Sequence, residues 1–159
     1  MAAPSMPAHF GDVPPQVELP AKVFTVEEAD RLLPSLESIF REMAQRSLRL
    51  REVLELAQDL EEYWGDRIGA PEFPERAAYL ELVREREELQ ASLQQDIERI
   101  LGLGAVLKDY QQGLVDFYGI VEGRLVFLCW QRGETALRFY HTLESGFAGR
   151  RPLATAPQP

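Results

Sequence analysis

The chain has 159 residues, of which 45% are hydrophobic and 27% charged, proportions typical of a folded protein. That length suffices for one ordinary domain with a buried core but not for two large ones. The formal net charge of −9 disfavours a nucleic-acid-binding protein, because the sequence offers no basic cluster for a phosphate backbone beyond the short pair Arg150-Arg151. The longest apolar run, Leu125 to Trp130, is much shorter than the ~20 residues of a membrane span.

The chain begins with a Pro- and Ala-rich segment, residues 1–22, which has neither the basic start nor the apolar core of a secretory signal. We expect this arm and residues 154–159 to be disordered, and residues 23–153 to form a single domain. The single cysteine, Cys129, excludes an intrachain disulfide and fits a reducing, cytoplasmic compartment.

The first expected element is a short helix that begins after Thr25. Thr25 and Glu28 have the spacing of a capping box, in which each side chain accepts from the other residue's backbone N–H. Pro34 interrupts this run, since proline lacks an amide donor and crowds the preceding turn. The sequence therefore predicts a short helix through Leu33 and a new one from Pro34; a kinked continuous helix is the alternative.

The next segment carries apolar residues at seven-residue intervals. They form two rows, Leu36, Met43, Leu50, Ala57 and Trp64 in the first, Ile39, Val53 and Leu60 in the second. Gly and Pro mark residues 65–74 as a loop, and a second long helix is expected over residues 75–101. The heptads indicate an antiparallel, coiled-coil-like two-helix hairpin over residues 23–102. Arg46 and Arg86 interrupt the apolar seams, either with their guanidinium groups extended to solvent or paired with an acid across the helix interface.

Charge is distributed unevenly between this hairpin and the rest of the chain. Residues 24–102 contain 19 acidic and 10 basic side chains, whereas residues 103–159 contain five acidic and six basic ones. The helical part therefore carries the negative charge.

Residues 103–153 contain short β-branched and aromatic runs separated by turn residues, which predicts a small antiparallel β-sheet module. Strands are expected at 106–107, 114–117, 125–130 and 137–141. In a meander, Asp116, Cys129 and His141 share one face, and Phe117 and Trp130 share the other. Both faces are largely apolar, so each needs a cover, which is the tail 146–153, a second copy of the chain or a partner. The expected fold class is α+β, a helical hairpin with a short N-terminal helix followed by this sheet.

Several motifs occur in a specific order and spacing. They are Thr25-x-x-Glu28-Ala29, Leu32-Leu33-Pro34, Lys108-Asp109, residues 113–117, 128–130 and 133–134, His141, and residues 146–153. Together they resemble a bacterial domain-of-unknown-function family, numbered 2203, over residues 24–153. The resemblance implies a bacterial protein and brings no established activity. It also implies that the connection 118–123 varies within the family, which weakens the case for a hairpin at Glu122-Gly123.

Carboxylates and an imidazole in the sheet module suggest a divalent metal site. The candidate ligands are Asp109, Asp116, Glu134 and His141, with Glu144 as a further carboxylate. A mixed oxygen and nitrogen set suits Mn²⁺, Fe²⁺ or Zn²⁺, although the spacing matches no recognised metal motif. The alternative is structural: Asp116 caps a turn or pairs with an arginine, and His141 is a hydrogen-bonded core residue.

Two further features of the sheet module could have a catalytic or ligand-binding role. Cys129 lies on the same face as His141, so a thiol–imidazole pair is conceivable, although a cysteine within an apolar strand usually behaves as a small hydrophobe. Residues 146–152 combine two glycines with basic residues, and Arg150 is a candidate for binding an anion or polar ligand. The structural alternative is an irregular tail that crosses the sheet.

The sequence is compatible with two classes of function and identifies no catalytic residue. The first is a non-enzymatic cytoplasmic binding or scaffolding protein that forms a homodimer, or contacts another protein, through the helical hairpin. The second is a divalent-metal-binding protein or small metal-dependent enzyme that uses the carboxylate and histidine cluster.

Overall fold

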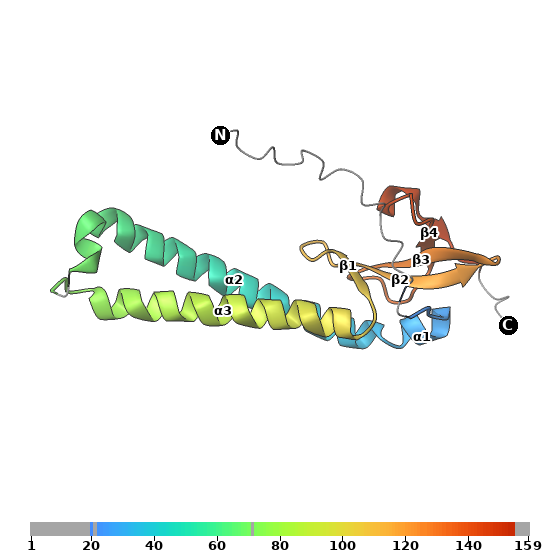
Figure 1. The fold of residues 1–159 in the computed structure, drawn as a ribbon, viewed down its shortest axis with the longest axis horizontal. Coiled ribbons are helices and arrows are strands. Elements are labelled where there is room, and N and C mark those ends of the chain that lie inside the picture. The colour runs from blue at the N-terminus through green and yellow to red at the C-terminus, as the bar shows by residue number, and fades with distance from the viewer. Residues whose placement is uncertain (1–19, 21, 71, 155–159) are drawn as a thin grey trace, which may run out of the picture.

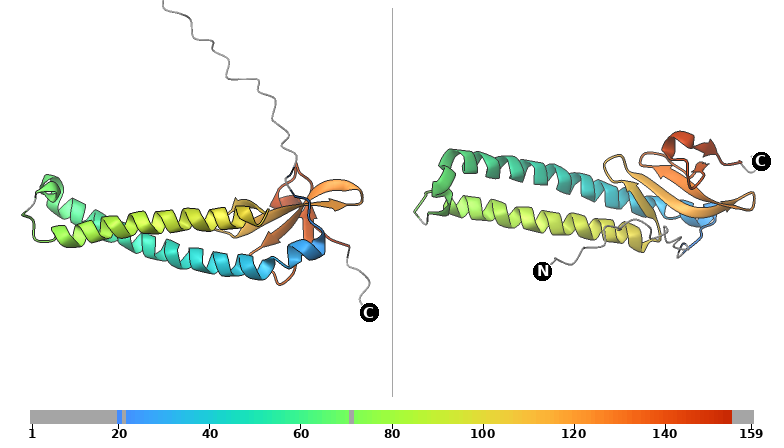
Figure 2. Two further views of the ribbon diagram at one scale, coloured as in Figure 1. Left: turned by 60° about the horizontal axis from the view of Figure 1, so that its bottom comes forward. Right: turned by 45° about the horizontal axis from the view of Figure 1, so that its top comes forward.

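The computed structural model describes residues 20, 22–70 and 72–154; nearly all of both expected arms lies outside these ranges. The elements, in chain order, are α1 (Val26–Asp30), α2 (Leu33–Trp64), the 3₁₀ turn η1 (Gly65–Gly69), α3 (Arg76–Gly102), β1 (Val106–Asp109), β2 (Leu114–Val121), β3 (Arg124–Gln131), β4 (Phe139–His141), the 3₁₀ turn η2 (Phe147–Gly149) and β5 (Arg151–Pro152). The fold class is α+β, as the sequence predicts. The two long helices lie side by side and project far beyond the sheet, which sits at one end of the hairpin (Figures 1 and 2).

The start of the helical part follows the expected capping chemistry. Thr25 Oγ1 accepts from the Glu28 N–H at 3.1 Å, and Glu28 Oε1 accepts from the Thr25 N–H at 3.3 Å. The short first helix and the long second one are separate elements, with Pro34 in the first turn of α2, where its missing N–H is not needed.

The hairpin contains a charged pair within its apolar seam. Asp96 of α3 is only 2% exposed, and its Oδ2 accepts from Arg46 Nη1 of α2 at 2.5 Å. Arg99 lies 3.3 Å from the other oxygen of Asp96 and 2.8 Å from Glu42. Of the two interpretations of Arg46, pairing across the helix interface is therefore the one found here.

All five strands form one antiparallel sheet in the order β1-β2-β3-β4-β5. β2 and β3 pair over their full lengths and turn at Glu122-Gly123, where φ is 52° and 76°. Positive φ at both central residues is the geometry of a tight two-residue hairpin. The expectation that a variable connection weakens this hairpin was therefore wrong, because β2 continues through Val121. β5, which the sequence pattern did not predict, pairs with β4.

The inner face of the sheet packs against the helices. Val115, Phe117, Val126, Leu128 and Trp130 are all buried there, in one cluster with apolar residues of α1, α2 and α3. The rings of Phe40 and Trp130 lie 6.1 Å apart, centre to centre. Burial of this surface fixes the hairpin to the sheet and leaves the opposite, outer face to be covered by other means.

The tail of the chain covers part of the outer face. The Arg150 guanidinium lies 4.2 Å from the centre of the ring of Phe139, which is opposite Cys129 and on the same face. The end of the tail instead extends the edge of the sheet, where the Leu153 N–H donates to the Arg138 carbonyl at 2.7 Å. The tail is the first of the three covers expected from the sequence. Within the described ranges, no helix combines the length and apolar character needed to cross a membrane.

Candidate metal centre

Three polar side chains meet on the outer face of the sheet, one from each central strand. Asp116 of β2 is directly opposite Cys129 of β3 in the strand register. His141 of β4 is opposite Phe127, two residues before Cys129 and therefore on the same face. Neighbouring residues on one face of an antiparallel sheet lie within side-chain contact. The pairing of the strands thus brings together residues up to 25 positions apart.

These residues, called the triangle below, form a compact and buried group. One ligand-type atom from each of Asp116, Cys129 and His141 lies within 4.8 Å of those of the other two. The residues are only 1%, 2% and 4% exposed, respectively. Among the described residues, this is the one group of three acidic, cysteine or histidine side chains with such geometry.

Hydrogen bonds fix the orientation of the His141 ring. Nδ1 lies 2.7 Å from the Thr142 carbonyl oxygen, and Nε2 lies 2.9 Å from Asp116 Oδ2. A carbonyl can only accept, so Nδ1 carries the proton that it donates to Thr142. Histidine ligands of metals commonly donate one ring N–H to a backbone carbonyl, which directs the other nitrogen toward the ion. Here Nε2 is directed into the triangle.

The Cys129 side chain is in a setting that keeps it protonated in the metal-free protein. Burial, followed by the nearby Asp116 carboxylate, raises the pKa of the thiol to about 12. A nucleophilic cysteine needs the opposite environment, one that stabilises the thiolate near neutral pH. The geometry therefore argues against Cys129 and His141 as a catalytic thiol–imidazole pair, whereas a bound cation would supply the charge that stabilises the thiolate.

A pocket of about 250 Å³ opens above the triangle. Its rim includes Lys108 of β1 and the segment 143–147, which precedes and enters η2. Lys108 is held with its Nζ 4.4 Å from the centre of the Phe127 ring. The triangle forms part of the pocket lining, so a group held there faces a space large enough for water or a small ligand.

The structure brings two of the four carboxylate and histidine ligands suggested by the sequence, Asp116 and His141, into the triangle. Asp109 instead closes the turn after β1, where its Oδ1 accepts from the backbone N–H groups of Gln111 and Gln112 at 2.9 and 3.0 Å. Glu134 closes the turn after β3 and accepts from the Gln131 N–H at 2.5 Å. Glu144, the further carboxylate, lies on the rim of the pocket.

Arg150, the candidate anion-binding residue, is engaged by the protein itself. Its Nη2 donates to Glu134 Oε1 at 2.6 Å and to the Cys129 carbonyl at 3.1 Å. Its guanidinium also lies close to the rings of Phe139 and Phe147, 4.2 and 4.6 Å from their centres. These contacts tie the tail to β3 next to the triangle.

Cys129 belongs to the triangle but is not among the metal ligands suggested by the sequence. The expected meander already placed Cys129 on one face with Asp116 and His141. The sequence did not give the exact register, which sets Cys129 directly opposite Asp116 rather than two residues further along the same face.

The chain was also compared with known proteins. Neither the search of curated proteins nor that of solved structures returned a match. The family model described as "uncharacterized conserved protein (DUF2203)" matches residues 22–153, which cover the triangle, the hairpin and the tail. The chain belongs to the DUF2203 family.

Proposed function

We propose that this protein binds a transition-metal ion of the zinc type through Asp116, Cys129 and His141. The observation that carries the proposal is the meeting of one oxygen, one sulfur and one nitrogen ligand atom within 4.8 Å in a buried site. A thiolate with an imidazole and a carboxylate is a donor set that suits Zn²⁺ and related ions. The proposal keeps two residues of the ligand set suggested by the sequence and replaces Asp109 and Glu134 with Cys129.

Two neighbouring features support a metal role over a purely structural hydrogen bond between Asp116 and His141. The Thr142 carbonyl holds the ring with Nε2 toward the triangle, as in many histidine metal sites. The pocket above the triangle provides space for a fourth ligand, the arrangement found where a metal binds water or a small substrate. A reducing cytoplasm, which we propose as the location, would keep Cys129 available as a thiol.

The direct test uses protein purified without a metal-affinity column. After incubation with excess zinc and gel filtration, elemental analysis is expected to find about one ion per chain. Replacement by Co²⁺ is expected to give a thiolate-to-cobalt charge-transfer band in the near ultraviolet, since Cys129 is the chain's only cysteine. Protein that retains neither ion would contradict the proposal.

Matched variants separate this ligand set from the one suggested by the sequence. Cys129→Ser is expected to abolish the charge-transfer band and to lower zinc affinity at least about tenfold. Asp109→Asn and Glu134→Gln change carboxylates that lie outside the triangle, and both are expected to bind zinc like the wild type. If these two variants lose the metal and Cys129→Ser keeps it, the set of Asp109, Asp116, Glu134 and His141 is the better one.

A second candidate function, self-association of the hairpin, is favoured by a different observation. Most of the hairpin lies away from the sheet (Figure 1), and Leu48 and Leu56 of α2, eight residues apart and therefore on one side of the helix, are 57% and 48% exposed. A second copy packed along α2 would bury these leucines in a four-helix arrangement and make the protein a homodimeric scaffold. Contact with a different protein is the alternative use of the same surface.

Light scattering across micromolar concentrations tests the dimer. A second copy predicts twice the chain mass of 18.1 kDa, and the double variant Leu48→Gln, Leu56→Gln is expected to return the protein to 18.1 kDa. A wild type that stays at 18.1 kDa throughout would exclude the homodimer.

A further inference from the structure

We propose that a second cavity, separate from the triangle, binds a small organic anion that also carries an apolar group. The cavity has a volume of about 370 Å³ and lies between α2 and two turns of the sheet module. Phe40, Met43, Ala44, Ser47 and Arg51 come from α2, Tyr110 and Gln111 from the turn after β1, and Arg132 from the turn after β3. Its volume is at the lower end of the range of small-molecule sites, which indicates a small ligand.

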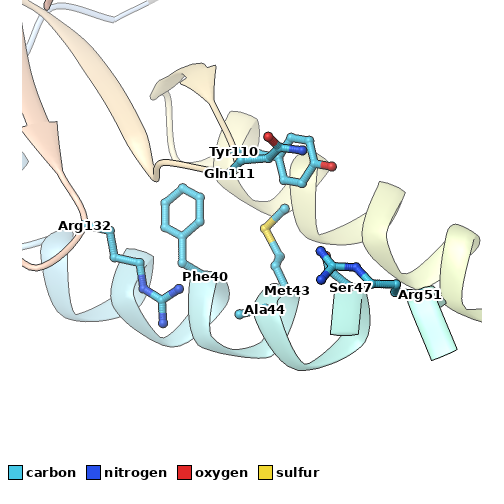
Figure 3. Close-up of a pocket in the computed structure, with 8 residues that line it drawn as sticks. All are labelled: Phe40, Met43, Ala44, Ser47, Arg51, Tyr110, Gln111 and Arg132. Carbon is cyan, nitrogen blue, oxygen red and sulfur yellow. The ribbon is translucent and has the colours of Figure 1, made fainter. Parts of the chain in front are cut away.

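The lining has an apolar base between two cations. Figure 3 shows Phe40 and Met43 in the middle of the cavity, with Arg132 toward one end and Arg51 toward the other. Phe40 and Met43 are only 2% and 3% exposed, so they are held firmly by the core beneath them. These two side chains expose little surface themselves, and the Tyr110 ring, which is 47% exposed, adds apolar surface at the cavity. An aromatic or aliphatic body can pack there while an acidic group reaches a guanidinium.

The polar groups around this base can all donate hydrogen bonds, and the two guanidinium groups can only donate. Ser47, Tyr110 and Gln111 contribute hydroxyl and amide groups, and none of the eight described lining residues is acidic. This composition is unusual in a chain of net charge −9, whose helical part has almost twice as many acidic as basic residues. A lining with two guanidinium groups and no carboxylate selects for a negative ligand.

The guanidinium groups of both arginines can bind an additional anionic group. Arg51 has no acidic group within ion-pair distance anywhere in the described ranges, although Glu52 and Glu55 are nearby in sequence. Arg132 contacts Glu37 only loosely, at 3.6 Å from Nε to Oε2, and that glutamate also accepts from the Gly133 N–H at 2.9 Å. A carboxylate, sulfonate or phosphate can therefore bind a guanidinium fork without displacing a tight ion pair.

Two dyes test the charge requirement directly. Anilinonaphthalene sulfonate is an apolar body with one anionic group, and phenylnaphthylamine has nearly the same body without the charge. The sulfonate is expected to bind the full-length protein with one site per chain and to bind more weakly as salt is added. Its affinity is expected to exceed that of the uncharged dye about tenfold, the value of one charge-assisted contact.

Variants place that binding in the cavity. Arg51→Gln with Arg132→Gln is expected to remove the preference for the sulfonate, and Ser47→Phe is expected to weaken both dyes by filling the space. Arg41→Gln is the matched control for each single arginine replacement, because it removes one positive charge from an exposed position of α2 outside the lining. Cys129→Ser is expected to leave dye binding unchanged, so failure of the metal proposal and failure of this one are distinguishable.

Three results would overturn the proposal. They are equal affinity for the two dyes, an unchanged preference in the double arginine variant, and unchanged binding in Ser47→Phe. Circular dichroism of each variant checks that the fold is retained, and Arg132→Gln alone serves if the double variant is unfolded.

Discussion

Arg46 of α2 and Asp96 of α3 lie 50 residues apart in sequence and form a direct ion pair within the hairpin seam. The two residues differ in exposure: the Asp96 side chain is 3% exposed, whereas that of Arg46 is 32% exposed. The arginine can therefore reach solvent when its partner is removed, but the aspartate cannot. A buried carboxylate without its partner is costly, because it has lost its hydration without compensation.

This asymmetry predicts that removal of the arginine alone is costly. Arg46→Ala is expected to lower the free energy of unfolding by about 2–4 kcal/mol, since Arg99 compensates Asp96 only in part. The double variant Arg46→Leu, Asp96→Leu is expected to recover most of that loss by packing apolar groups in the seam. Urea unfolding monitored by circular dichroism measures both. If Arg46→Ala lowers the free energy of unfolding less than Arg99→Ala does, Arg46 is not the main partner of Asp96.

The capping box predicts a contribution to acid sensitivity from Glu28. Hydrogen bonds with Thr25 hold the pKa of Glu28 below its ordinary value of 4.5. A lowered pKa in the fold stabilises the protein above pH 4.5, and this contribution is lost as pH falls through the folded pKa. Glu28→Gln retains the capping acceptor but does not titrate, so its melting temperature is expected to fall less than that of the wild type between pH 6 and about 3. Parallel pH curves for the two proteins would exclude the contribution.

Arg150 is expected to matter for the stability of the sheet edge. It bonds to Glu134 and to the Cys129 carbonyl, and it packs against two aromatic rings. Arg150→Met keeps much of the apolar contact but leaves Glu134 without its cation, so we expect a loss of about 2 kcal/mol in unfolding free energy. In the same variant, hydrogen exchange of the β4 backbone amides is expected to be faster than in the wild type. Arg151→Met, at the exposed neighbouring position, is the control and is expected to change neither measurement.

The helical part could be predicted from the sequence because its signals are local. Capping residues, proline and the seven-residue repeat each act within one or two turns of helix. The same seven-residue repeat also indicates a buried acidic residue in the second long helix. A seven-residue step leads from Leu82 to Leu89 and then to Asp96, which places an acid in the seam as the partner for Arg46.

The candidate site was less accessible to prediction because it depends on register. Alternation along the strands shows that Asp116, Cys129 and His141 share a face, but not which of them meet. Likewise, Asp109 and Glu134 look like ligands by residue type, whereas the structure uses them to close turns. Short strands such as β5, with only two residues, carry too little pattern to be predicted.

Cys129 provides a test of the triangle that requires no metal. Because burial and Asp116 raise the pKa of the thiol to about 12, almost no thiolate is present at pH 8 in the metal-free fold. Alkylation by iodoacetamide is expected to be at least about tenfold slower in the native protein than in urea-unfolded protein at the same pH. Rapid native alkylation would show an exposed or activated thiol and would contradict the buried geometry. Asp116→Asn removes the neighbouring negative charge, so its thiol pKa is expected to move downward while remaining above that of the unfolded chain, because burial is the larger cause.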